Sequence, residues 1–142
     1  PLEVVPLSAE RGPDVLITGL DVPQTAREGQ TVPLIVRLQS GLSGPARVEV
    51  FADGELVGAS DVELTPGDSE LRVEVPAGLA GFRRFEARVS APGDAQALNN
   101  RAAAFTQVDG PPRVLLLAGA ADRAAPLQAA LEAANVRATL LN

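Results

Sequence analysis

Residues 32–39 read VPLIVRLQ, and every second residue of this stretch is Val or Leu. The positions between them include the polar residues Arg37 and Gln39. Successive side chains of a β-strand point to opposite faces, so this period of two predicts a strand that buries only one face. The stretch therefore predicts a sheet that packs against a second apolar layer.

Short runs of the same kind recur along the chain at intervals of roughly ten residues. They are residues 14–22, 47–50, 56–57, 62–64, 71–75, 84–89 and 102–108. Turn signals separate them, and Asp53-Gly54 is typical of a tight hairpin. Seven or eight short strands at this spacing predict a mainly β fold, an immunoglobulin-like antiparallel β-sandwich over residues 13–109.

The pattern changes after the linker Gly110-Pro111-Pro112, whose two prolines predict a stiff connection. Residues 113–119 form a continuous apolar run, typical of a strand that is buried on both faces of a parallel sheet. Residues 136–141 predict a second strand. A truncated β-α-β unit of an α/β domain is therefore expected at residues 113–142.

A helix is predicted between these two strands. Pro126 favours the first helical turn, with Asp122 or Ala125 near the N-cap. Apolar residues recur there at helical spacing, and they are Leu127, Ala130, Leu131 and Ala134. Asn135 is a suitable residue for a left-handed C-cap. Nine large aliphatic residues in this unit are too few to offset the entropy of ordering it. We therefore expect this unit to pack against the sandwich, to pair with another chain or to be partly disordered.

The composition excludes many kinds of chemistry. Cys, His, Met, Trp, Tyr and Lys are absent, so all twelve basic residues are Arg. The chain therefore lacks a thiol nucleophile, an imidazole base and a Schiff-base lysine. The usual ligands of zinc, haem and iron–sulfur clusters are absent as well. We expect a protein that is not an enzyme and uses no cofactor or metal.

Charge and hydropathy limit the classes of partner that this chain can have. The net charge of −6 disfavours non-specific binding to nucleic acid. The longest strongly apolar run, residues 114–118, is far shorter than the roughly 20 residues of a membrane-spanning helix, so no membrane insertion by this segment is expected. The chain begins with Pro and contains no Met. We therefore expect a segment of a larger protein, with residues 1–12 as a linker or the tail of a preceding domain.

Two groups of residues can each be interpreted either as a functional site or as a purely structural feature. The segment 119–122 lies between a strand and a helix, where phosphates bind in Rossmann-like folds, but the G-x-G-x-x-G pattern is absent and a tight turn is favoured. The carboxylates Asp53, Glu55, Asp61 and Glu63 could contact Ca²⁺. Their spacing does not match a calcium loop, so a solvated surface is favoured.

A candidate interaction surface consists of Phe51, Phe82, Arg84 and Arg88. The two phenylalanines have the opposite parity to the apolar core positions of their strands, so either would mark a domain contact if exposed. The alternative is packing beneath a loop. The two arginines share a face with Glu86, which predicts cross-strand ion pairs or, alternatively, a site for an anion or acidic partner.

Turn and strand motifs in residues 13–108 carry a family resemblance. They are Pro13-Asp14-Val15-Leu16-Ile17, Glu28-Gly29-Gln30, Phe51-Ala52-Asp53-Gly54, Leu64-Thr65-Pro66-Gly67 and Leu98-Asn99-Asn100. With them the stretch resembles the CARDB-type sandwich, the cell-adhesion-related domain found in bacteria. We expect Asn99 and Asn100 to cap the turn into the last strand through side-chain-to-backbone hydrogen bonds.

With residues 110–117 included, the chain resembles the middle of large bacterial membrane proteins. In those proteins a von Willebrand factor type A domain precedes such a sandwich, and a flavodoxin-like domain resembling class I glutamine amidotransferases follows it. The resemblance implies a location on the extracellular or periplasmic side of a bacterial membrane. Residues 113–142 would then be the first β-α-β unit of the following domain.

These observations favour a non-catalytic structural module that spaces and docks the neighbouring domains of its parent chain. One alternative is an adhesion-type module that binds a protein or a carbohydrate. Another is the N-terminal piece of an α/β enzyme or ligand-binding domain whose site lies downstream. Self-association through residues 113–142 is a further expectation, because paired strands with open edges invite it.

Overall fold

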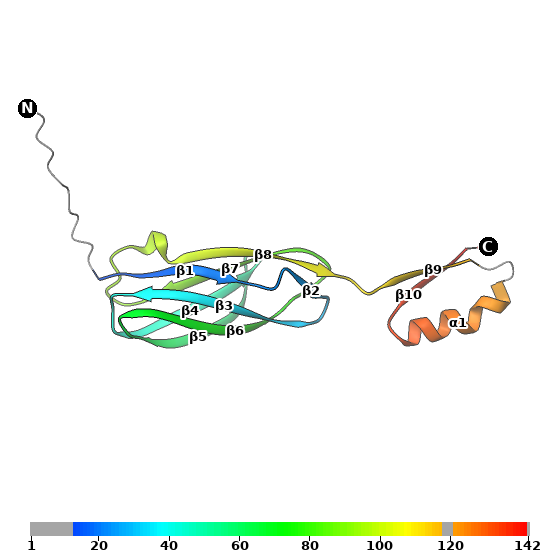
Figure 1. Cartoon of the computed structure of the whole chain (residues 1–142), viewed down its shortest axis with the longest axis horizontal. Helices are drawn as coiled ribbons and strands as arrows, with labels where there is room; N and C mark the ends of the chain where they lie inside the picture. The colour runs from blue at the N-terminus through cyan, green and yellow to red at the C-terminus, as the bar shows by residue number, and fades with distance from the viewer. Residues whose placement is uncertain (1–12, 118–120, 142) are drawn as a thin grey trace, which may run out of the picture.

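Two β-sheets packed face to face form the larger part of the chain in a computed structural model that describes residues 13–117 and 121–141 (Figure 1). The smaller sheet has the order β1-β3-β6, with β1 at Val15–Asp21, β3 at Thr31–Ser40 and β6 at Gly67–Pro76. The larger sheet has the order β2-β8-β7-β4-β5. Its strands are β2 (Thr25–Arg27), β4 (Gly44–Ala52), β5 (Glu55–Leu64), β7 (Gly81–Ser90) and β8 (Arg101–Asp109).

The predicted mainly β, immunoglobulin-like sandwich is confirmed, with eight strands over the two sheets. Every strand pair in it is antiparallel except β2 and β8, which run parallel. The sequence did not predict β2, because a three-residue strand with only Ala26 buried shows no alternating pattern. The expectation for residues 1–12 lies outside the described residues.

Apolar side chains at alternate strand positions form the core between the two sheets. In β3 the residues Val32, Leu34, Val36 and Leu38 are all buried, as the period of two predicts. They meet the inward residues of the larger sheet, among which Phe85 is fully buried. Pro33 fits within β3 because the pairing with β1 ends at Ile35, so only β6 lies beside it.

The hairpin between β4 and β5 has the turn that the sequence predicts. Asp53 and Gly54 have φ values of 49° and 92°, and a positive φ at both central residues defines the type I′ turn. This turn also places Asp53 beside β7, where its Oδ1 atom accepts the N–H of Arg84 at 2.9 Å. The hairpin is therefore tied to the centre of the larger sheet.

Beyond the linker, β9 (Arg113–Leu117), α1 (Ala121–Ala133) and β10 (Arg137–Leu141) form the predicted β-α-β arrangement, with β9 and β10 paired in parallel. The predicted alternative with Asp122 near the helix start agrees with the structure, but the prediction that Pro126 lies in the first turn was wrong. Helix α1 begins at Ala121, and Pro126 lies in its interior. Alanine favours helix strongly, so an alanine-rich start extends the helix one turn before the proline.

The end of α1 confirms the predicted cap. Asn135 has a φ of 59°, in the left-handed region. The N–H of Asn135 donates to the carbonyl of Glu132 at 3.0 Å, and the N–H of Val136 donates to the carbonyl of Leu131 at 2.9 Å. This pair of hydrogen bonds is the Schellman motif, which turns the chain into β10.

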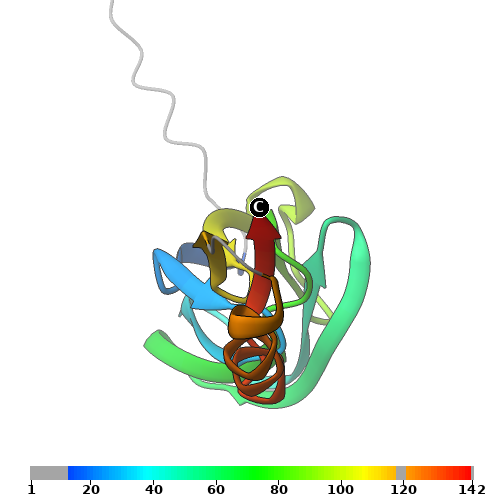
Figure 2. The same cartoon turned by 90° about the vertical axis from the view of Figure 1, so that its right-hand side faces the viewer.

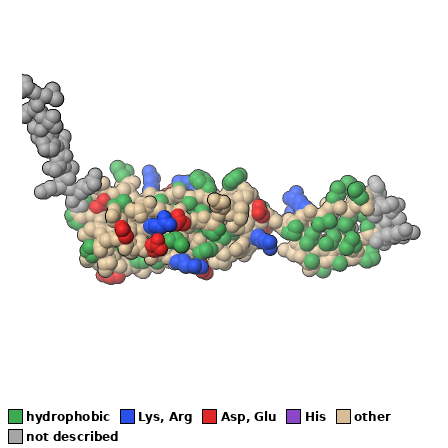
Figure 3. Space-filling view, viewed as in Figure 1, with side chains coloured by type: hydrophobic (Ala, Val, Ile, Leu, Met, Phe, Trp, Pro, Cys, Tyr) green, Lys and Arg blue, Asp and Glu red, His purple; other side chains and the backbone are tan. Residues whose placement is uncertain are grey.

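Apolar side chains of the β9–α1–β10 unit remain exposed. Leu117 is 78% exposed and Leu127 is 53% exposed. Among the described side chains of this unit only Ala124 is buried. Figure 3 shows apolar side chains gathered over this unit, while most of the visible charged side chains lie on the sandwich. Viewed along the long axis, the unit stands in front of one end of the sandwich (Figure 2).

Candidate functional site

The solvent-facing side of the larger sheet, hereafter the outer face, holds all four predicted surface residues. Phe51 comes from β4, while Phe82, Arg84 and Arg88 come from alternate positions of β7. In the pairing of β4 with β7, Phe51 lies opposite Glu86, so the two neighbouring strands bring these side chains onto one surface. Residues far apart in the sequence thus meet because β4 and β7 pair at the centre of the sheet.

Glu86 lies between the two arginines and is only 7% exposed. Its carboxylate accepts hydrogen bonds from Arg88 at 2.7 Å and from Arg84 at 2.6 Å. The hydrogen bond from Arg88, joined by that from Arg84, outweighs burial and lowers the pKa of Glu86. The expected cross-strand pairing was wrong for these residues, because side chains two apart on one strand share a face and pair along β7.

A cation–π contact joins this ion network to the aromatic part of the outer face. The guanidinium carbon of Arg88 lies 4.3 Å from the centre of the Phe51 ring. Phe51 is half-buried under this contact. The guanidinium group of Arg88 is therefore held through its Nε atom by Glu86 on the same strand and across its face by Phe51 on β4.

Three large apolar side chains of the outer face stay exposed: Phe82 at 82%, Phe105 at 62% and Leu56 at 54%. Phe105 on β8 stands opposite Arg84, one diagonal step from Phe82. Phe82 does not pack beneath a loop, which was the alternative that the sequence left open. The outer face thus combines exposed aromatic rings with an ordered pair of arginines.

The sequence placed Glu86 on the same face as the two arginines, but Phe105 and Leu56 were missed as members of this surface. The parity of Phe105, opposite to that of Val108, was a usable signal. Leu56 had none, because a shift in the β4–β5 register between Val50 and Phe51 decides which residue faces outward there.

The four carboxylates considered for calcium binding do not converge. Asp53 pairs with Arg83 at 3.0 Å, and Asp61 pairs across the strands with Arg47 at 2.9 Å. The hydrogen bond with Asp61 raises the pKa of Arg47. In the part of the chain that the structure describes, no group of three or more Asp or Glu side chains could hold a metal ion.

Asn99 and Asn100 bind carboxylates, so the expected capping of the backbone by their side chains was wrong. The Nδ2 atom of Asn99 donates to Asp14 Oδ2 at 2.8 Å, and that of Asn100 donates to Asp94 Oδ2. Burial alone would raise the pKa of Asp94, but hydrogen bonds, led by that from Asn100, lower it. The 3₁₀ turn η1 (Ala97–Asn99) brings these amides to the start of β1.

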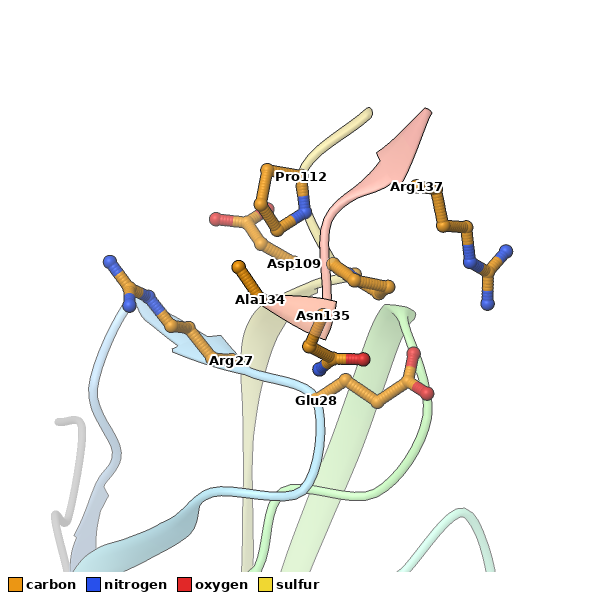
Figure 4. A pocket seen from close by; sticks show the side chains of 9 residues that line it. Arg27, Glu28, Asp109, Pro112, Ala134, Asn135 and Arg137 are labelled. Atoms are coloured by element: carbon orange, nitrogen blue, oxygen red, sulfur yellow. The ribbon is translucent and has the colours of Figure 1, made fainter. Parts of the chain in front are cut away.

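A crevice lies where the linker leaves the sandwich (Figure 4). Glu28 and Asn135 face this crevice, while Arg27 and Arg137 flank it with their guanidinium groups directed away. The Glu28 carboxylate accepts a hydrogen bond from the N–H of Ala80 at 3.2 Å, so it holds the backbone of the loop before β7 in the sandwich. The segment 119–122 lies mostly outside the described residues, and its expected turn remains a prediction.

Comparisons with solved structures reveal the fold class. The chain is similar to the CARDB domain of the PF1109 protein from Pyrococcus furiosus, solved in complex with di-metal ions. The identity is 20%, the match covers 69% of this chain and 90% of that one, and the TM-score is 0.60. A domain of a protein described as a cell surface protein, from Methanosarcina acetivorans, matches at 18% identity over 68% of this chain and 92% of that one, with a TM-score of 0.53.

A β-glucosidase from Listeria innocua also contains a similar sandwich, at 12% identity and a TM-score of 0.52, over 69% of this chain but 16% of the enzyme. No protein-family model matches the chain. No curated protein matches it either. These likenesses define an immunoglobulin-like β-sandwich, and its solved neighbours include CARDB domains. Across residues 13–117 and 121–141, no helix is long and apolar enough to cross a membrane.

Proposed function

We propose that this chain is a non-catalytic module of a larger bacterial protein, which spaces and docks the domains beside it. The placement of the aromatic residues carries this proposal. The chain has four phenylalanines, and three of them (Phe51, Phe82 and Phe105) lie on the outer face, while only Phe85 is in the core. Exposed aromatic side chains gathered on one face are typical of protein-docking surfaces.

The charges of the outer face indicate the chemistry of its partner. Arg84 and Arg88 are half exposed and flank the exposed rings, while the carboxylate between them is already neutralised. Ordered arginines beside aromatic rings suit a surface that offers carboxylates and apolar side chains. We assign this surface to a neighbouring domain of the same parent chain.

The linker supports a spacing role, because hydrogen bonds hold it at both ends. At the sandwich end the N–H of Glu28 donates to the carbonyl of Asp109 at 2.9 Å. At the other end the N–H of Arg137 donates to the carbonyl of Pro112 at 2.9 Å. Only Gly110 and Pro111 lie between these fixed points, and proline restricts its own φ. The ring of Pro111 removes one free backbone angle from this short segment, which supports a restricted range of orientations between the two parts.

The location that we propose is the extracellular or periplasmic side of a bacterial membrane. The likeness to a domain of a described cell surface protein supports it. The absence of cysteine is compatible with that location. The flanking von Willebrand factor type A and glutamine amidotransferase-like domains are part of the same proposal.

Residues 113–142 carry a second proposal, that they begin an α/β domain. Leu115, Leu117 and Leu141 are each about half exposed or more. Continuous apolar strands of this kind are buried in parallel sheets that have helices on both faces. A longer chain would supply those layers, and a second copy of this unit would be the alternative cover.

The docking proposal is tested by titrating the ¹⁵N-labelled chain with the separately produced domains that flank it in the parent protein. We expect saturable shifts of β7 and β8 amide signals. The double variant Phe82→Ser/Phe105→Ser should weaken binding at least about tenfold, because central aromatic residues carry most of the binding energy. The variant Arg72→Ser, on the opposite sheet, is the matched control. Equal binding by all three proteins would contradict the proposal.

A further inference from the structure

Four polar side chains meet at the end of the sandwich where β1 begins. Asp14 precedes β1 and Asp94 lies in the loop after β7. Asn99 ends the η1 turn, and Asn100 follows it directly. The two amide–carboxylate hydrogen bonds described above link them in pairs. The N–H of Val15, the residue after Asp14, donates to the Oδ1 atom of Asp94 at 3.5 Å, which joins the two pairs into one cluster. In Figure 1 the turn of η1 stands beside the start of β1.

Three oxygen atoms of this cluster are buried without a hydrogen-bond partner: Asp14 Oδ1, Asn99 Oδ1 and Asn100 Oδ1. Asn100 is only 7% exposed, and its terminal amide is directed at the Asp94 carboxylate. An unsatisfied buried polar atom destabilises a fold, so native structures rarely retain one. Three such acceptors on linked side chains indicate a ligand that accepts electron pairs.

The charge of the cluster indicates the same kind of ligand. In residues 13–117 and 121–141, no arginine forms an ion pair with Asp14 or Asp94. Their side-chain partners are the neutral amides of Asn99 and Asn100. The cluster therefore carries negative charge that no described basic side chain pairs with, and a cation would balance that charge.

We propose that Asp14, Asp94, Asn99 and Asn100 form a binding site for a divalent cation, with calcium preferred. Carboxylate and amide oxygens are the ligands of hard cations. One buried water can donate hydrogen bonds to only two of the three free oxygens, whereas a cation can be coordinated by all three. Magnesium sheds its waters reluctantly, so shielded oxygens such as these favour the larger ion, which accepts irregular coordination.

The site would join separate segments of the sandwich. The Oδ1 atom of Asp94 accepts the N–H groups of Val15 at 3.5 Å and of Gln96 at 3.2 Å, so the same carboxylate already links the loop to β1. A bound ion would add the Asp14 and Asn99 oxygens to this link. Calcium would thereby fasten the η1 loop to the end of the sandwich at which the chain enters.

The test is a titration of the full 142-residue chain with CaCl₂, compared with MgCl₂ and with NaCl at matched ionic strength. Calorimetry should give one site with a dissociation constant on the order of 10⁻⁴–10⁻³ M, the range of extracellular calcium modules. In ¹⁵N NMR spectra, the side-chain amide signals of Asn99 and Asn100 should shift saturably with the same constant. At 10 mM calcium, roughly tenfold or more above that constant, the melting temperature should rise by about 5 °C or more.

Two variants make the test specific. Asp94→Asn should weaken calcium binding at least about tenfold, while Asp61→Asn, which removes an exposed carboxylate, should leave it unchanged. Asn100→Asp should bind calcium more tightly and should melt at a lower temperature in its absence, because it adds a third carboxylate.

Several results would overturn the proposal. Calcium could produce no heat and no shift of the Asn99 and Asn100 signals. The melting temperature could rise equally with NaCl, or equally in Asp94→Asn and Asp61→Asn. If Asp94→Asn does not fold, the wild-type NMR titration and the Asn100→Asp affinity decide the question.

Discussion

Leu34 and Val36 of β3 are fully buried, whereas Leu115 and Leu117 of β9 are 56% and 78% exposed. Strand β3 carries large aliphatic side chains at alternate positions, and β9 carries them at four consecutive positions, 114–117. The difference arises from what faces them. Strand β3 meets a second sheet, whereas within residues 113–117 and 121–141 β9 pairs with β10, and α1 packs against β10. Burial therefore depends on the number of packed layers, and of the two described regions the sandwich has a complete pair of layers.

Truncating one leucine in each region should give the largest contrast. We expect Leu34→Ala to lower the free energy of unfolding of the sandwich by about 2–5 kcal/mol, because it leaves a cavity in the core. Leu117→Ala should change it by less than about 0.5 kcal/mol. Urea denaturation followed by circular dichroism measures both. Similar losses for the two variants would show that the β9–α1–β10 unit shares the core of the sandwich.

The helix offers a way to sharpen this contrast. Pro126→Ala should favour the helical state of α1 by up to about 3 kcal/mol, because it restores a backbone hydrogen bond and removes a clash. Amide exchange in α1 should slow, while exchange in β3 and β7 should not change. Slower exchange in the sandwich as well would contradict the independence of the two regions.

The ion network of the outer face predicts a dependence on pH. The pKa of Glu86 is lowered in the folded protein, so its contribution to stability is present above the unfolded pKa and is lost as the pH falls through the folded value. Stability should therefore decline on acidification below about pH 4, and less steeply in Glu86→Gln. Denaturation midpoints measured across this range in both proteins test it. Parallel pH profiles would mean that Arg84 and Arg88 do not stabilise the carboxylate.

The linker should affect geometry and leave stability nearly unchanged. Replacing Pro111 and Pro112 with glycine should broaden the distribution of distances between the sandwich and residues 113–142, because glycine restores backbone freedom. The melting temperature of the sandwich should stay the same. Small-angle scattering measures the first quantity, and an unchanged scattering profile would count against a spacing role for the prolines.

Local sequence preferences correctly predicted the hairpin turn and the helix C-cap, because both depend on the conformation of one or two residues. Asp53-Gly54 and Asn135 occupy backbone conformations that few other residues tolerate, so their roles were visible in the sequence. The interior position of Pro126 in α1 was not, since the alanine-rich segment outweighed the preference of Pro126 for the first turn. Propensities of opposite direction cannot be ranked without the tertiary setting.

The candidate surface was predictable only in part. Parity placed Phe51, Phe82, Arg84 and Arg88 on the outward positions of their strands, and the structure brings them onto one face. Parity could not identify Leu56, which depends on a register shift. It also could not bring Asp14 to Asn99, because that contact joins residues 85 positions apart.

Hydroxyl-radical footprinting of the phenylalanines tests the central claim, that the outer face docks a neighbouring domain, most directly. The free chain and the longer parent protein would be oxidised under identical conditions and analysed by mass spectrometry. We predict that Phe82 and Phe105 are oxidised readily in the free chain and protected in the parent, while the buried Phe85 reacts little in either. Equal oxidation of Phe82 and Phe105 in the two proteins would contradict the claim.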